Sequence, residues 1–135
     1  MCGCEIGNNA KIIKKIYRRL NGRLHACARM YTFSPLKRKI IGCRSVLDLG
    51  CGYNSPLKHF SKNFYSVGVE FFKPYLLRSK EARVHHDYIL ADITKLEFSP
   101  KSFDTVLALD VLEHLTKGDG LNLIKNMEKI ACKTL

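Results

Sequence analysis

A short apolar run that leads directly into a glycine turn is the feature that most constrains this chain. Residues 46–52 read Val-Leu-Asp-Leu-Gly-Cys-Gly, and Ser55-Pro56 follows as a helix start. Serine caps helix N-termini, and proline suits the first helical position. A strand, a Gly-x-Gly turn and a helix N-terminus bring backbone N–H groups toward a ligand without side chains in the way. We therefore expect the turn Gly50-Cys51-Gly52 to form part of a binding site.

Size and composition indicate one globular domain. The chain has 135 residues, of which 46% are hydrophobic and 26% charged, so it can bury a core. No apolar run approaches the roughly 18 residues of a membrane span. The six cysteines show no framework spacing, and Cys2-Gly3-Cys4 has no second pair to complete a zinc site. We expect free thiols in a reducing compartment, no metal site and a cytoplasmic location.

The positive charge is concentrated at the N-terminus. Residues 1–44 hold eleven Lys and Arg against Glu5 alone, whereas the other residues hold twelve against eleven acids. We expect a basic helical extension or lid over residues 1–43 and a nearly neutral domain over residues 44–135. The extension carries an apolar stripe with helical spacing among its basic residues, formed by Ile12, Ile13, Ile16, Tyr17, Leu20 and Leu24. Two readings remain open: a helix with a solvated basic face, or one that binds an anionic partner such as nucleic acid, phospholipid or an acidic substrate.

From residue 44 onward, strand and helix patterns alternate. The expected strands are Ser45–Leu49, Tyr65–Glu70, Tyr88–Ala91 and Phe103–Leu109. The expected helices are Ser55–Lys62, Lys73–Ala82 and Gly120–Ala131, the last with one apolar side formed by Leu121, Ile124, Met127 and Ile130. Such alternation implies right-handed crossovers and an α/β fold, in which helices cover both faces of a doubly wound parallel sheet.

Acidic residues end three of the expected strands. Glu70 ends the second, Asp92 follows the third and Asp110 follows the fourth, with Glu113 and His114 just beyond. Ligands of such sheets bind at the carboxyl ends of the strands. A carboxylate at position 70 can accept hydrogen bonds from two ribose hydroxyls, and one at position 92 from a purine amine. Singly, each acid could be a cap or a turn residue, but together with the glycine turn they indicate one nucleoside site.

A dinucleotide site is the main alternative for this pattern. It favours a third glycine or an alanine, G-x-G-x-x-G/A, where this chain has Ser55. Asp48 also adds a carboxylate before the turn, where a pyrophosphate would gain nothing from it. A carboxylate at that position suits a ligand that bears an ammonium group.

The motifs together resemble those of the class I S-adenosylmethionine-dependent methyltransferases, in the small-molecule, type 11-like branch. The resemblance covers about residues 44–131 and rests on Val46–Gly52, Gly68-Val69-Glu70, Ala91-Asp92-Ile93 and Phe103–Leu115. It implies a Rossmann-like fold and S-adenosylmethionine (SAM) as cofactor. Asp48 and the turn Gly50-Cys51-Gly52 would hold the methionine moiety and Glu70 the ribose. Asp92 and the backbone N–H of Ile93 would hold the adenine, and Asp110 would line the reactive end.

By this resemblance the protein would transfer a methyl group from SAM to an unidentified acceptor, a small molecule or otherwise, and leave S-adenosylhomocysteine. Methyl transfer mainly requires alignment, and a base is needed only where the acceptor must lose a proton early. The candidate catalytic residues are Asp110 and His114, with His114 as the base. His114 can equally be a polar residue in the first turn of a helix. The alternative function is a non-catalytic or partner-completed nucleotide-binding module.

The chain departs from the family in its strand number. The family sheet has seven strands, whereas this sequence predicts about four and ends after the helix that follows the fourth. The fourth strand would then form an apolar sheet edge that needs covering. A truncated gene product, completion by a partner chain and dimerisation through this edge all remain open.

Overall fold

The structure is a computed structural model that describes residues 36–60 and 63–132. The chain divides into two compact units, residues 1–38 and 39–135. The amphipathic stripe expected over residues 12–24 and three of the cysteines, Cys2, Cys4 and Cys27, lie outside the described residues. Nearly all of the described residues belong to the second unit. In the described part of the chain no helix is both long and apolar enough to cross a bilayer.

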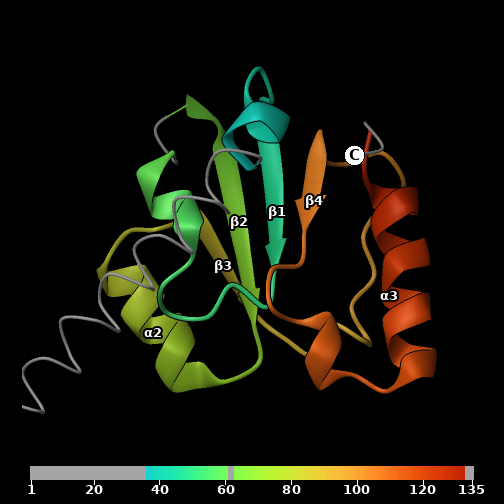
Figure 1. The fold of residues 1–135 in the computed structure, drawn as a ribbon. Helices are drawn as coiled ribbons and strands as arrows, with labels where there is room; N and C mark the ends of the chain where they lie inside the picture. The colour runs from blue at the N-terminus through green and yellow to red at the C-terminus, as the bar shows by residue number, and fades with distance from the viewer. Residues whose placement is uncertain (1–35, 61–62, 133–135) are drawn as a thin grey trace, which may run out of the picture. The chain divides into compact units, whose positions relative to one another are not determined.

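The centre of this unit is a sheet of four parallel strands (Figure 1). The strands are β1 (Ser45–Leu49), β2 (Tyr65–Glu70), β3 (Asp87–Leu90) and β4 (Thr105–Leu107), in the spatial order β3-β2-β1-β4. Asp48 of β1 lies opposite Gly68 of β2 and Leu107 of β4. Because the strands are parallel, all four carboxyl ends meet at one edge of the sheet, as the sequence predicted.

The core forms around the inner strands. β1 is buried along nearly its whole length, which explains its continuous apolar sequence. Helix α2 (Lys73–Glu81) packs on β2 and β3, and helix α3 (Lys117–Ile130) packs on β4. Burial of each large aliphatic side chain contributes about 1.5–3 kcal/mol. The buried cluster comprises Leu47, Leu49, Val67, Val69, Val106, Val111, Leu123, Ile130 and Ala131.

The segment after the glycine turn is shorter than predicted. The sequence indicated a helix over Ser55–Lys62, whereas the structure has a single 3-10 turn, η1 (Pro56–His59). Ser55 caps this turn as expected, because its hydroxyl accepts a hydrogen bond from the N–H of Leu57 at 3.2 Å. Bonds from Lys58 to Ser55 and from Phe60 to Leu57 have the i to i+3 spacing of a 3-10 helix.

Helix α3 differs from its prediction in both its start and its buried face. It begins at Lys117, not Gly120, because the Thr116 side chain accepts a hydrogen bond from the N–H of Asp119 and caps it there. Leu123 and Ile130 are buried, but Leu121 is 53% exposed and Ile124 is 40% exposed. The predicted apolar side was therefore wrong at those two positions. Position 120 faces inward instead, and glycine there adds no side chain to the hydrophobic pattern.

Strand β4 lies at one edge of the sheet, as predicted, but it is shorter than the expected Phe103–Leu109. Phe103 pairs on the outer side with Ala131, in an isolated parallel bridge that follows α3. The N–H of Cys132 donates to the Phe103 carbonyl at 2.8 Å. Among the described residues, Thr105–Leu107 pair with a strand on the β1 side alone.

Candidate cofactor site

The glycine turn needs glycine at two positions. Gly50 and Gly52 have φ values of +69° and +56°, which disfavour other residues. A methyl group on Gly50 would lie 2.5 Å from Cγ2 of Val111, whereas one on Gly52 would meet no atom within 4 Å. The N–H of Cys51 donates to the Val69 carbonyl at 3.0 Å, which ties the turn to β2.

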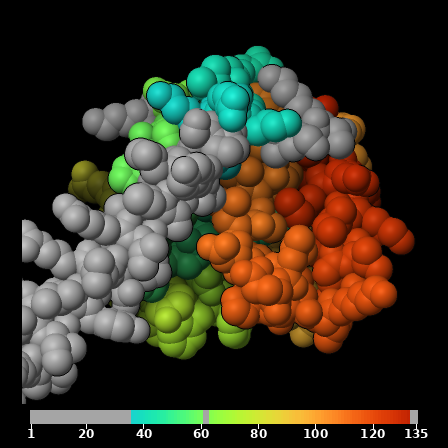
Figure 2. Space-filling model, in the orientation of Figure 1, coloured from blue at the N-terminus to red at the C-terminus, as the bar shows by residue number. Residues whose placement is uncertain are grey.

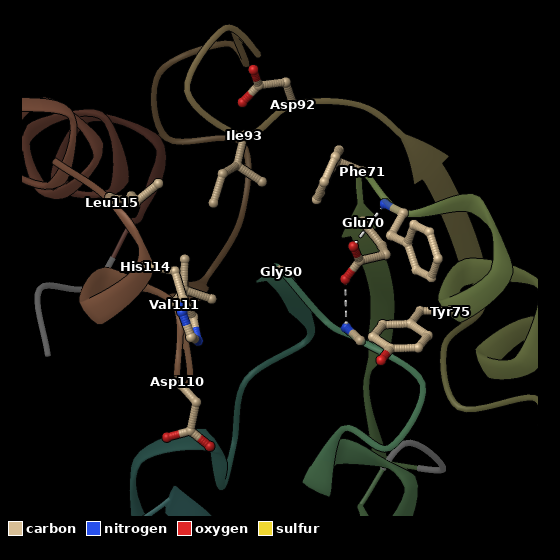
Figure 3. Close-up of a pocket in the computed structure, with 12 residues that line it drawn as sticks. Gly50, Glu70, Phe71, Tyr75, Asp92, Ile93, Asp110, Val111, His114 and Leu115 are labelled. Atoms are coloured by element: carbon tan, nitrogen blue, oxygen red, sulfur yellow. Dashed lines mark hydrogen bonds between the residues drawn. The ribbon is translucent and has the colours of Figure 1, made fainter.

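Glu70 at the end of β2 fastens the same turn through its carboxylate. Oε2 accepts a hydrogen bond from the N–H of Gly52 at 3.0 Å, and Oε1 accepts one from the N–H of Phe72 at 2.8 Å (Figure 3). The residue is only 8% exposed. Each carboxylate oxygen can accept more than one hydrogen bond, so Glu70 can hold these amides and still accept from a ligand hydroxyl.

Asp92 and Ile93 follow β3 on a turn. Oδ1 of Asp92 accepts from the N–H of Thr94 at 3.0 Å and from its hydroxyl at 2.7 Å, and Lys95 lies 3.5 Å from Oδ2. These bonds, chiefly those from Thr94, hold the pKa of the Asp92 carboxyl below its ordinary value. An ionised carboxylate is an acceptor, which is the state that an exocyclic amine requires.

Asp110 and His114 follow β4, on the other side of the turn. Asp110 has a φ of +55°, a conformation that asparagine and aspartate adopt more readily than most residues. His114 ends η3 (Leu112–His114), the 3-10 turn before α3. Both side chains are exposed. Thr116 caps α3.

These strand ends surround one cavity of about 560 Å³. Five predicted site residues besides Asp110 and His114 reach it, from both the turn and the strand ends: Gly50, Gly52, Glu70, Asp92 and Ile93. In Figure 3 the Ile93 and Phe71 side chains point toward the space above Gly50, and the Asp110 carboxylate points away from Glu70. Figure 2 shows the surfaces around η3 (orange) and the start of α2 (yellow-green) on the same face of the molecule.

The cavity also has an apolar wall that sequence reasoning missed. Phe71, Phe72 and Tyr75 line it beside Glu70, and Val111 and Leu115 line it beside His114. Phe71 is 74% exposed, which is unusual for so large an apolar side chain. The signal was present in the sequence, because Phe71-Phe72 follow Glu70 directly where the sheet ends. An apolar wall with a few polar groups is typical of a small-molecule or cofactor site.

Asp48 and Cys51 do not line the cavity. Both are buried beneath the turn, where Oδ2 of Asp48 accepts a hydrogen bond from the Ser55 hydroxyl at 2.6 Å. Burial raises the pKa of Asp48 to about 7. Burial, with the nearby charges of Asp48 and Glu70, raises the pKa of the Cys51 thiol to about 12. These two residues support the turn from below, and no three His, Cys, Asp or Glu of the described chain gather as metal ligands.

The chain resembles known methyltransferases in sequence and in structure. The model of the methyltransferase domain family matches residues 47–133. N-methyltransferase 4 of Papaver somniferum is 32% identical over 53% of this chain and 23% of its own length. An uncharacterised protein of Methanocaldococcus jannaschii is 31% identical over 62% of this chain and 36% of its own length. This chain therefore spans about a quarter to a third of the length of these curated relatives.

The fold is also similar to that of solved methyltransferase structures. The magnesium protoporphyrin IX methyltransferase of Synechocystis, solved with bound SAM, superimposes with a TM-score of 0.66 at 17% identity. The match covers 81% of this chain and 57% of that one. At this identity the likeness supports the Rossmann-like fold, while the family follows from the sequence match. The chain belongs to the methyltransferase domain family.

Proposed function

We propose that this protein binds SAM in the cavity at the strand ends and transfers its methyl group to a small-molecule acceptor. The product would be S-adenosylhomocysteine. One observation carries the proposal: Glu70, Asp92 and Asp110, each from a different strand end, line one cavity together with both glycines of the turn. The acids are placed for a ligand with a hydroxylated sugar at one point and an amine at another.

Different residues around the cavity would bind different portions of SAM. Glu70 would accept from the ribose hydroxyls, and Asp92 from the adenine amine, with the adenine ring against the Phe71 side of the apolar wall. The backbone N–H of Ile93 would face a ring nitrogen. Gly50 and Gly52 would leave room for the methionine portion, above Asp48 and Cys51. Asp110 would line the end where the methyl group is transferred.

The chemistry that the cofactor supplies is an electrophilic methyl group on a sulfonium. The chain has to align the acceptor with that group and keep competing water away, and alignment of this kind is worth up to about 7–11 kcal/mol. His114 lines the same cavity and is exposed, so its imidazole can take a proton from the acceptor. Asp110 lies four residues earlier on the same loop and lines the cavity beside it.

Binding of S-adenosylhomocysteine to the purified chain, measured by calorimetry, tests the proposal. Glu70→Ala should weaken binding by at least about tenfold, because it removes hydrogen bonds to a charged acceptor. Glu81→Ala is the matched control, since Glu81 ends α2 on the exposed surface and does not line the cavity. Thermal unfolding of both variants would separate lost binding from lost folding. No detectable binding by the wild-type chain at millimolar ligand would contradict the proposal.

A further inference from the structure

A histidine with no exposed side-chain surface lies beneath the glycine turn. His85 stands between α2 and β3, and its Nε2 is 3.4 Å from Oδ2 of Asp48. Within the described residues neither ring nitrogen makes a well-aligned hydrogen bond. A buried polar group without a partner costs free energy, so the contact with Asp48 is the interaction that can offset this cost.

The sheet leaves room for this ring at one position. Gly68 of β2 lies opposite Asp48, and a methyl group on it would sit 2.5 Å from Cδ2 of His85 and 2.9 Å from Sγ of Cys51. Any larger residue at position 68 would displace the imidazole or the thiol. The backbone of His85 is also held, because its N–H donates to the Tyr88 hydroxyl at 2.8 Å, which in turn donates to the Ser79 carbonyl.

His85 and Ser55 converge on a single oxygen of Asp48. The Ser55 hydroxyl donates to Oδ2 at 2.6 Å and accepts from the N–H of Leu57, at the point where η1 begins. Asp48 stands two residues before Gly50, and Ser55 three residues after Gly52. The carboxylate therefore joins the two ends of the turn, and the imidazole supports the carboxylate from the side of β2.

Asp48 lies among other ionisable groups, so its ionised form is better stabilised by a second hydrogen-bond donor in addition to Ser55. Cys51 and His85 lie close to it, the charge of Glu70 acts on the same Cys51 thiol, and His86 follows His85. Burial lowers the pKa of His85 to about 4, with a smaller effect from His86, so the ring is neutral near pH 7 and carries one N–H. The ionised form of Asp48 then depends on Ser55 and that N–H for its stabilisation.

We propose that His85 is a positioning residue for cofactor binding, whose Nε2, 3.4 Å from Oδ2 of Asp48, donates to that carboxylate in the ligand-bound state and so holds both ends of the glycine turn in place. This inference rests on the proposed function of the site. His85 does not touch the ligand, and it acts only through Asp48 and Ser55. It follows that cofactor affinity depends on a buried side chain that does not itself line the cavity.

Two substitutions of His85 separate donation from packing. His85→Leu keeps an apolar side chain in the space but has no donor, whereas His85→Gln keeps an N–H that can reach Asp48. S-adenosylhomocysteine affinity, measured by calorimetry on both sides of neutral pH, should fall about tenfold or more in His85→Leu. The pH at which this affinity is half its maximum should be higher in His85→Leu than in the wild type, because ionised Asp48 has lost a hydrogen-bond donor. His85→Gln should recover most of the loss, and the neighbouring His86→Gln should bind like the wild type.

Two results would overturn the inference while leaving the proposed function intact. One is wild-type affinity with an unchanged pH profile in His85→Leu, and the other is equally weak binding by His85→Gln and His85→Leu. Failure of the wild-type chain to bind would overturn both proposals.

Should His85→Leu not fold, nitrogen NMR of the wild-type chain decides the question. A proton on Nε2 in the ligand-bound state supports the inference, and a proton on Nδ1 alone overturns it.

Discussion

The Glu70 carboxylate accepts a hydrogen bond from the backbone N–H of Gly52 at 3.0 Å, so the end of β2 holds the turn that follows β1. The side chain predicted to bind a ribose therefore also fixes the backbone next to it. Its other oxygen accepts from Phe72, whose side chain lines the same cavity. One buried carboxylate thus sets the relative positions of the turn and the aromatic wall.

Gly50→Ala should destabilise the protein by about 1–3 kcal/mol. Its φ is positive, and the added methyl group would lie 2.5 Å from Val111. Gly118→Ala is the control, because Gly118 lies in α3 and the nearest atom to an added methyl is 3.9 Å away. That control should stabilise the protein by about 0.4–1 kcal/mol. Urea unfolding checks both, and a Gly50→Ala variant as stable as the wild type would contradict the strained turn.

Helix α3 offers a paired test of the corrected buried face. Leu123 is 2% exposed and Leu121 is 53% exposed on the same helix. Leu123→Ala should cost about 2–5 kcal/mol in unfolding free energy, because it leaves a cavity against the sheet. Leu121→Ala should stay within about 0.5 kcal/mol of the wild type. Chemical denaturation would show the larger loss in Leu121→Ala if the helix instead buried the side that the sequence predicted.

The pair Asp48 and His85 should make opposite contributions to stability as pH changes. Asp48 has its folded pKa raised from 3.8 to about 7, so the stability it contributes is full below 3.8 and is lost as pH rises through 7. His85 has its folded pKa lowered from 6.5 to about 4, so its contribution is full above 6.5 and is lost as pH falls through 4. Between these values the two slopes oppose each other.

Single substitutions should separate the two contributions to the pH dependence of the unfolding free energy, each measured relative to the wild type. Asp48→Asn leaves the His85 contribution, so stability should rise as pH increases from about 4 to about 6.5. His85→Gln leaves the Asp48 contribution, so stability should fall as pH increases from about 4 to about 7. Urea unfolding at several pH values gives the difference curves. Variant curves that run parallel to the wild type would show that neither group titrates as the structure indicates.

His114→Gln should reduce kcat without reducing cofactor affinity, if its imidazole accepts the acceptor's proton. General-base catalysis typically contributes about 10²–10⁴-fold. Methyl incorporation into a panel of small acceptors measures kcat, and calorimetry with S-adenosylhomocysteine measures affinity. Glu113→Gln, on the neighbouring exposed position of η3, is the control. An unchanged kcat in His114→Gln would assign His114 to the cavity wall alone.

The local pattern of the chain was enough to predict its fold class and the strand ends that surround the cavity. The run Val46–Leu49, the glycine turn and the acids at positions 70, 92 and 110 each depend on neighbours in sequence. Apolar continuity predicts a buried parallel strand, and parallel strands bring their carboxyl ends to one edge. These features predicted the sheet and the polar and glycine residues around its cavity, but not the apolar wall on either side of them.

The tertiary structure decided which residues of each helix are buried and which residues from separate elements come into contact. Leu121 and Leu123 have the same apolar character, and only packing on β4 shows that position 123 is the buried one. His85, just before β3, and Asp48 of β1 are 37 positions apart, and pairing of β2 with both β1 and β3 brings them together beside Gly68. Sequence pattern reports periodicity within one element, whereas such contacts depend on how separate elements pack. The residues that meet at the strand ends could therefore be predicted from the sequence, whereas the contact between His85 and Asp48 is visible only in the fold.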